Sequence, residues 1–158
     1  MNQGVLLLHG VNLPRLVLTP LAHDLKAAGF GPVLNWSYRS WRPGGVAAIA
    51  ERVAKRLRKE FPNGVPVLHL VGHSMGGLIQ RRLLADGIIP GGGRYISLGT
   101  PHFGATRAGR MGDWWSFRLL FGSAGQDLRP DCAFLKTLPL PPPTQSLCIY
   151  GGTGKDRG

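Results

Sequence analysis

Val67-Leu-His-Leu-Val-Gly72-His73-Ser74-Met75-Gly76-Gly77 is the stretch of this chain that decides its fold. The segment Val65–Val71 predicts a strand buried on both faces, because its apolar residues run on with little polar alternation. After Ser74, apolar residues recur at helical spacing, and Gly87 predicts the end of that helix. A strand that turns sharply into a helix at a serine is the arrangement that exposes a serine nucleophile.

Ser74 is therefore the candidate nucleophile. A serine hydroxyl reacts slowly until geometry and a base activate it. The glycines on either side of Ser74 fit the geometric requirement, because a tight turn with a strained central residue needs neighbours without side chains. The pattern is short and its chemistry depends on the strand and helix around it.

Two further strands end in turn-forming residues. Gly4–Leu8 is an apolar run that ends in His9-Gly10, and residues 94–98 lead into Gly99-Thr-Pro-His-Phe-Gly104. Ligands of open parallel sheets bind at the carboxyl ends of the strands. The three turns therefore predict one site at one edge of a sheet.

On these residues the chain resembles the α/β-hydrolase superfamily, in particular its small bacterial lipases and esterases. The matching motifs are Leu8-His9-Gly10, Gly72-His-Ser-Met-Gly-Gly77 and Gly99–Gly104, and the resemblance covers roughly residues 3 to 152. It implies an α/β fold, a mostly parallel sheet flanked by helices. About five strands are visible, so the expected version of the fold is minimal and incomplete.

The resemblance also implies roles for two backbone groups. Ester hydrolysis passes through a tetrahedral oxyanion, which two N–H donors stabilise. One donor is expected from Met75, the residue after the nucleophile, and the other from Val11, after the first strand. No metal or organic cofactor is implied.

The base and the acid of a catalytic triad are not evident. The family order is serine, acid, histidine, yet His102 is the only histidine after Ser74, and it precedes the last expected strand. We expect the catalytic histidine beyond residue 158. The acid is either Asp156 or also beyond that point, while Asp113, Asp127 and Asp131 rank lower. These departures predict that the chain is an N-terminal portion of a longer hydrolase.

The alternation of strand and helix predicts one domain over residues 1–158. Expected strands cover Gly4–Leu8, Pro32–Trp36, the segment before Ser74, Arg94–Leu98 and Ser146–Tyr150. Expected helices start near Thr19 or Pro20 and at Gly44-Gly45. Residues 103–144 break the pattern with a cluster of aromatic residues. They are interpreted either as an irregular excursion packed on the sheet or as a cap that forms an acyl-binding wall over Ser74.

The charge is strongly positive, at +11 with 19 Lys and Arg against 8 acids. Because the cations look scattered over the surface, including the pair Arg81-Arg82, and no nucleic-acid fold is recognisable, we expect no nucleic-acid function. A weak association with anionic membrane surfaces is left open. No signal peptide or transmembrane segment is visible, which favours a cytoplasmic location. The two cysteines, Cys132 and Cys148, have no metal-ligand spacing.

The function predicted from the sequence is hydrolysis of carboxylic esters, of lipase or esterase type, through an acyl-enzyme on Ser74. The expected substrate is a small ester or a lipid, and the sequence does not determine the oligomeric state. Two alternatives use the same fold: a non-catalytic binding protein, or an acyltransferase or thioesterase with the same nucleophile.

Overall fold

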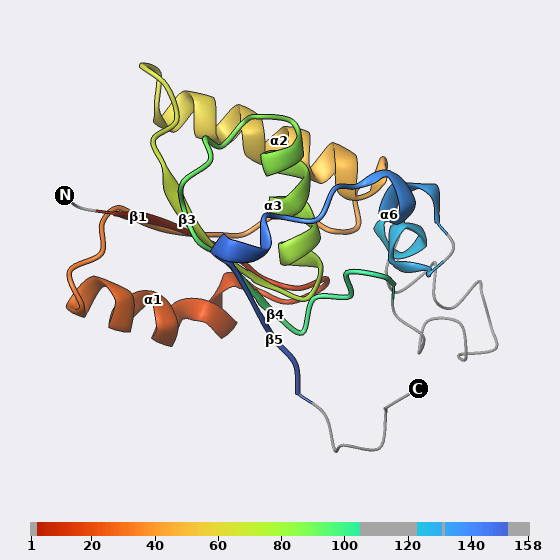
Figure 1. Cartoon of the computed structure of the whole chain (residues 1–158), viewed down its shortest axis with the longest axis horizontal. Coiled ribbons are helices and arrows are strands. Elements are labelled where there is room, and N and C mark those ends of the chain that lie inside the picture. The colour runs from red at the N-terminus through yellow and green to blue at the C-terminus, as the bar shows by residue number, and fades with distance from the viewer. Residues whose placement is uncertain (1–2, 105–122, 131, 152–158) are drawn as a thin grey trace.

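The computed structural model describes residues 3–104, 123–130 and 132–151. Its centre is a parallel sheet of five strands in the order β2-β1-β3-β4-β5 (Figure 1). The strands are β1 (Gly4–Leu8), β2 (Val33–Trp36), β3 (Leu68–His73), β4 (Tyr95–Leu98) and β5 (Ser146–Ile149). The α/β fold class and the five strands predicted from the sequence are therefore confirmed.

The start of β3 differs from the prediction. The expected strand began at Val65, but pairing begins where Gly4 of β1 lies opposite Leu68. Pro66 has no N–H to donate, and Val67 is 48% exposed. Residues 65–67 therefore form an approach to the sheet, and the strand continues to His73, directly before Ser74.

Helices cover both faces of the sheet: α1 (Thr19–Ala27) lies on one face, and α2 (Gly45–Glu60) and α3 (Met75–Ala85) lie on the other (Figure 1). The side chains of β1 alternate between two buried clusters, with Leu6 and Leu8 in the α2–α3 cluster and Val5 and Leu7 in the α1 cluster. A strand that is covered on both faces has a sequence that is a continuous apolar run. That is why the first strand was predictable to the residue.

The helix boundaries follow local signals. α1 begins at Thr19 with Pro20 in its first turn, and a short 3-10 helix, η1 (Arg15–Leu18), precedes it. After α3, Gly87 takes a positive φ of 65°, and the N–H groups of Gly87 and Ile88 donate to the carbonyls of Leu84 and Leu83. Glycine adopts this backbone conformation without steric cost, so the predicted stop is confirmed.

Part of the predicted cap, residues 105–122 and 131, lies outside the described residues. The rest contains η2 (Ser123–Leu128), α6 (Ala133–Thr137) and η3 (Pro143–Gln145). Here the carboxylate of Asp127 accepts a 2.7 Å hydrogen bond from the N–H of Val46, in the first turn of α2. Burial raises the pKa of Asp127, although this hydrogen bond opposes the shift. The single domain and the role as a cap stay predictions.

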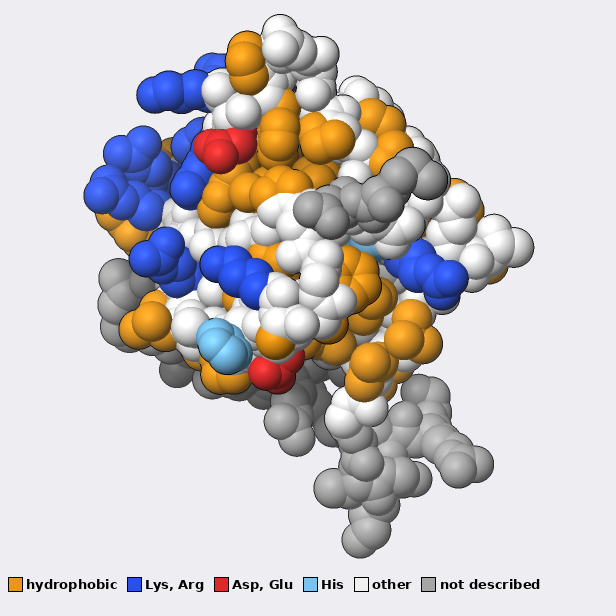
Figure 2. All heavy atoms as spheres, turned by 90° about the vertical axis from the view of Figure 1, so that its left-hand side faces the viewer, with side chains coloured by type: hydrophobic (Ala, Val, Ile, Leu, Met, Phe, Trp, Pro, Cys, Tyr) orange, Lys and Arg blue, Asp and Glu red, His pale blue; other side chains and the backbone are white. Residues whose placement is uncertain are grey.

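Among the described residues, no helix is both long enough and apolar enough to cross a membrane. Figure 2 shows one face of the molecule, on which lysine and arginine side chains gather to one side and acidic side chains are few. Several lysine and arginine side chains thus lie close together on part of this face.

Candidate active site

Ser74 stands alone between β3 and α3 in a strained backbone conformation. Its φ is 52° and its ψ is −123°, a combination that a residue with a side chain rarely adopts. Backbone strain of this kind costs about 1–3 kcal/mol and persists only where the surroundings enforce it. Two backbone hydrogen bonds do so here: Ser74 N–H donates to Leu98 O at 2.8 Å, and Gly77 N–H donates to Ser74 O at 3.1 Å.

The glycines of the motif allow close contact between backbones. A Cβ atom on Gly76 would overlap the carbonyl groups at the end of β1, and one on Gly72 would overlap the backbone of Gly77. A Cβ atom on Gly77 would overlap the side chain of Thr100. The three glycines therefore let α3 lie directly against β1 and the turn after β4, which fixes the position of Ser74.

The loop after β1 passes beside Ser74. A Cβ atom on Gly10 would lie 3.1 Å from Ser74 Cβ and 3.0 Å from His73 Nδ1. Val11 follows in this loop, and Met75 is the buried first residue of α3. Neither the Val11 N–H nor the Met75 N–H has a hydrogen-bond partner within residues 3–104, 123–130 and 132–151. Their predicted role as oxyanion donors stays a prediction.

His9 holds this loop through contacts that the sequence analysis missed. The Tyr38 N–H donates to His9 Nε2 at 3.3 Å, and the Tyr38 hydroxyl donates to the His9 carbonyl at 2.5 Å. The two rings are stacked with centroids 4.3 Å apart. Because Nε2 accepts, the proton is on Nδ1, which donates to the Gly10 carbonyl at 2.7 Å. Burial lowers the pKa of His9 and favours this neutral form.

A sequence signal for this contact did exist. Parallel strands that are neighbours end at the same edge of a sheet, and Leu8 of β1 pairs with Trp36 of β2. The residues just beyond them, His9 and Tyr38, are therefore placed side by side. Only the order of the strands was missing from the sequence.

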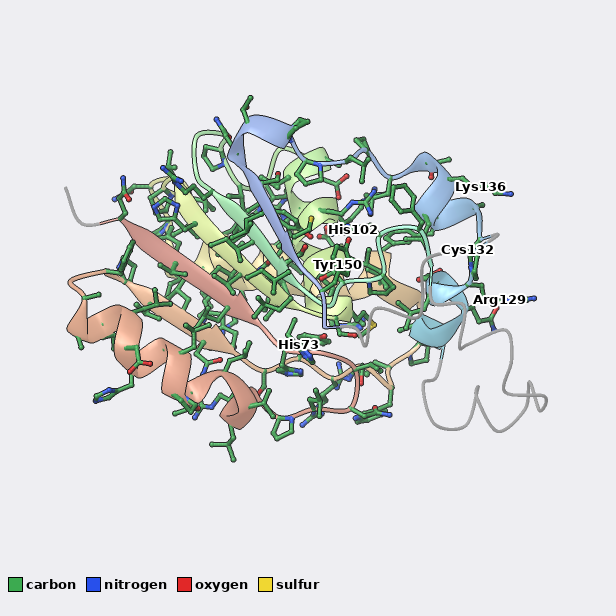
Figure 3. All side chains as sticks on the ribbon, turned by 60° about the horizontal axis from the view of Figure 1, so that its bottom comes forward. His73, His102, Arg129, Cys132, Lys136 and Tyr150 are labelled. Carbon is green, nitrogen blue, oxygen red and sulfur yellow. The ribbon has the colours of Figure 1, made fainter. Side chains whose placement is uncertain are left out.

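His102 belongs to a separate cluster. Its Nδ1 accepts a 3.2 Å hydrogen bond from Arg81 Nη1, so the neutral ring donates from Nε2 to Ser97 Oγ at 3.0 Å. Burial, and then the charge of Arg81, lower the pKa of His102 to about 4. Both ring nitrogens are thus engaged away from Ser74, and Figure 3 shows His102 apart from His73, the neighbour of Ser74.

Arg81 is not the surface cation that the sequence suggested. Its side chain is 2% exposed and donates to the carbonyls of His102, Leu138 and Pro139. Burial lowers the pKa of Arg81. One buried guanidinium therefore ties α3 to the turn after β4 and to the segment that leads into β5.

The remaining described histidines do not pair with Ser74. His69 Nε2 lies 2.6 Å from Gln3 Oε1 and its Nδ1 accepts from Arg94 N–H, while His23 is exposed beside Asp24. His73 Nδ1 is buried and has no hydrogen-bond partner among the described residues. No hydrogen bond joins a histidine to Ser74 Oγ in the part of the chain that the structure describes, and Asp156 lies outside it.

Metal-ligating groups do not converge in the described ranges, which hold no group of three or more His, Cys, Asp or Glu side chains placed for an ion. Both cysteines are free thiols: Cys148 is exposed, and Cys132 Sγ accepts from Leu135 N–H at the start of α6.

Known structures share this architecture. The lipase BlEst2 of Bacillus licheniformis in its mature form superposes with a TM-score of 0.63 at 21% identity, covering 85% of this chain and 57% of the lipase. The phospholipase PlaB of Legionella pneumophila gives 0.71 at 17% identity, over 94% of this chain and 39% of that protein. The fold is that of the α/β hydrolases.

A cutinase-like protein from Cryptococcus sp. also matches, with a TM-score of 0.57 at 15% identity over 94% of this chain and 75% of that one. No family model and no curated protein matches the sequence. The similarity at these identities is one of fold. This chain spans little more than half the length of BlEst2 and less than half that of PlaB.

Proposed function

We propose that this protein is a serine hydrolase that cleaves carboxylic esters through an acyl-enzyme on Ser74. The observation that carries the proposal is the strained backbone of Ser74, at a φ of 52° between β3 and α3, directly beside the Gly10 loop. Strain at a functional site is retained where it aims a reacting group. A residue with a side chain rarely adopts this conformation.

The chemistry assigns one task to each group. Ser74 Oγ attacks the ester carbonyl carbon while a base takes the hydroxyl proton, and the carbonyl oxygen becomes an oxyanion. The N–H groups of Met75 and Val11 stabilise that oxyanion. Collapse expels the alcohol, which leaves with the proton, and water then releases the acid from Ser74.

This sequence of steps needs a histidine base and a carboxylate that orients it. The described residues place neither at Ser74, and Asp156, one of the two alternatives for the acid, lies outside them. The non-catalytic alternative draws its support from the same observation, since a hydrolase fold that lacks a base would bind an ester without cleaving it. A measurement of turnover together with binding separates the two.

The proposed substrate class is an ester with an apolar acyl group. Support comes from the fold, which this chain shares with a lipase, a phospholipase and a cutinase-like protein, and from the aromatic residues of the 103–144 insertion. Fold alone does not choose among esterases, thioesterases and acyltransferases. Competition between ester and thioester substrates distinguishes these activities.

The test is a panel of p-nitrophenyl esters from acetate to palmitate, with the matching thioesters in parallel. Where the histidine base is present, we expect saturable turnover by the wild-type protein and none above background for Ser74→Ala. As a matched control, Ser146→Ala removes another serine hydroxyl at the half-buried start of β5 and leaves turnover unchanged. Equal turnover by Ser74→Ala would refute the proposal, while ester binding without turnover in both proteins would favour the binding alternative.

A further inference from the structure

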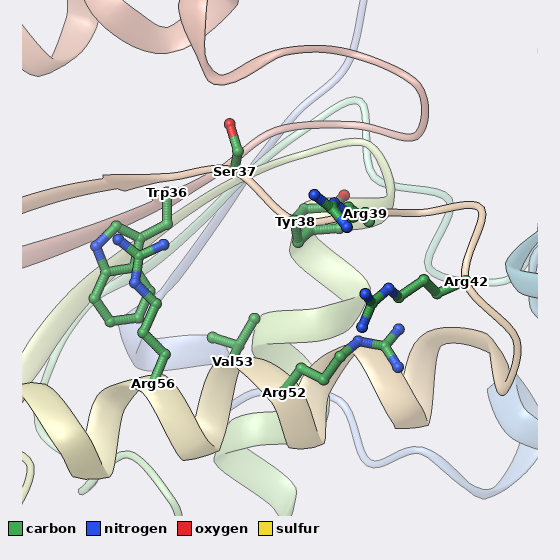
Figure 4. Close-up of a pocket in the computed structure, with 8 residues that line it drawn as sticks. All are labelled: Trp36, Ser37, Tyr38, Arg39, Arg42, Arg52, Val53 and Arg56. Carbon is green, nitrogen blue, oxygen red and sulfur yellow. The ribbon is translucent and has the colours of Figure 1, made fainter.

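A pocket of about 250 Å³ opens between α2 and the segment that follows β2. Its walls carry four arginines, of which Arg39 and Arg42 come from that segment and Arg52 and Arg56 come from α2. Trp36 and Tyr38 complete the wall on the side of the sheet (Figure 4). Four cations from two elements thus surround one cavity.

Positive side chains dominate the described lining of the pocket. No Asp or Glu among the described residues lines it. Figure 4 shows the guanidinium groups of Arg42 and Arg52 facing one another. Burial, and then the charge of Arg42, lower the pKa of Arg52. Positive charges that face one another repel, and an anion between them lowers that repulsion.

One donor of this cluster lacks a partner. Arg52 Nη2 is buried and makes no hydrogen bond within the described part of the chain. A buried donor that is left unsatisfied is costly, and native proteins keep few of them. Its presence beside a cavity points to a ligand that supplies the acceptor.

Aromatic rings hold two of the arginines in place. The guanidinium carbon of Arg56 lies 4.0 Å from the ring centroid of Trp36, and that of Arg39 lies 5.9 Å from the ring centroid of Trp41. Cation–π contacts of this kind orient the planar guanidinium group. The pocket therefore has part of its binding geometry before a ligand arrives.

We infer that this arginine pocket binds the phosphate group of a phosphate ester. A single guanidinium matches the two oxygens of a carboxylate, whereas a phosphate offers three terminal oxygens and up to two negative charges to several guanidinium groups at once. The cavity is larger than a phosphate ion, which leaves room for the ester substituent. The pocket thus accounts for part of the excess of basic residues in the sequence.

Tyr38 connects the pocket to the loop after β1. It is one of the lining residues, and its ring stacks on His9, whose loop leads to Val11. A phosphate ester in the pocket is therefore either the headgroup of a lipid or a soluble phosphate ester that binds beside the oxyanion loop. Both sources present the same chemistry to the arginines.

Isothermal titration calorimetry of the full chain with inorganic phosphate and with glycerol 3-phosphate tests the inference. We expect one saturable site, with affinity about tenfold weaker in Arg52→Gln, because a charge-assisted contact is lost. Arg58→Gln on the same helix removes the same charge outside the pocket and should change affinity less than about twofold. If Arg52→Gln does not fold by circular dichroism, Arg56→Gln replaces it.

Co-sedimentation with vesicles separates the two sources. Vesicles of phosphatidylcholine with phosphatidic acid should recruit the chain in an Arg52-dependent manner if the occupant is a lipid headgroup. Calorimetric binding without such recruitment identifies a soluble ester. Absence of binding in both experiments, or an equal loss in Arg52→Gln and Arg58→Gln, overturns the inference. Neither readout involves Ser74, so failure here is distinct from failure of the proposed hydrolase.

Discussion

Two turns at the carboxyl ends of neighbouring strands use their polar groups in opposite ways. The turn after β4 satisfies them: Arg81, His102 and Ser97 are joined by hydrogen bonds, and Arg81 also binds two carbonyls of the segment before β5. The turn after β3 leaves the Met75 N–H without a partner in the described chain and holds Ser74 in a strained conformation. The difference teaches that the turn after β4 uses its polar groups to stabilise the fold, whereas the turn after β3 keeps a backbone donor unpaired within the described residues.

The largest effect is expected from a change that separates α3 from β1. In Gly76→Ala the new methyl group meets the carbonyls of Leu8 and His9, so we expect a loss of about 3 kcal/mol of unfolding free energy. Gly91→Ala is the matched control, because nothing lies within 4 Å of its new Cβ. Urea denaturation measures both. Equal stability of the two variants would contradict the close approach on which the Ser74 turn depends.

The turn after β4 is tested by removing its guanidinium. Arg81→Met leaves the carbonyls of His102, Leu138 and Pro139 without their donor, and we expect a loss of about 2–3 kcal/mol. Arg82→Met, one residue further along α3, removes an exposed arginine and should change stability by less than about 0.5 kcal/mol. Thermal and urea unfolding measure the stability of both variants. Similar losses of stability would contradict the assigned role of Arg81 in the turn after β4.

The pH dependence of stability reports on the same turn. The pKa of His102 is about 4 in the folded chain and near 6.5 when unfolded, so the unfolded state binds more protons between these values. Stability is therefore complete above pH 6.5 and falls as the pH drops, by roughly 2 kcal/mol between pH 7 and pH 5. His102→Gln should reduce this difference. An unchanged slope in urea titrations of the variant would contradict the assignment.

The smallest effect concerns the loop beside Ser74. Tyr38→Phe removes the hydroxyl that donates to the His9 carbonyl but keeps the ring stack, and we expect a loss of about 1 kcal/mol. Tyr150→Phe changes an exposed tyrosine and serves as the control. Because the loop carries Val11, the same variant should lower ester turnover more than Tyr150→Phe does. Identical turnover in the two variants would show that the Tyr38 hydroxyl does not affect the candidate active site.

The sequence predicted what depends on neighbours along the chain. β1, the starts of α1 and α2 and the Gly87 stop follow from periodicity and from the backbone preferences of proline and glycine. The Ser74 turn was predictable for the same reason.

Contacts between distant residues were not predictable. Arg81 looked like a surface cation because its carbonyl partners lie up to 58 residues away, and Arg52 meets Arg42 only through the packing of α2 on the segment after β2. A charged residue on a helix gives the same sequence pattern whether its side chain faces a pocket or water. Such sites become visible only when the tertiary arrangement is known.

Intact-mass labelling of the 158-residue chain with a fluorophosphonate tests the central claim most directly, since such probes react with an activated serine. Where a histidine base is present, the account predicts a single adduct on the wild-type protein, located at Ser74 by peptide mapping, and no adduct on Ser74→Ala. Labelling at another serine, or equal labelling of Ser74→Ala, would contradict the assignment of Ser74 as the nucleophile, whereas no labelling of a chain shown to be folded would favour the non-catalytic binding alternative.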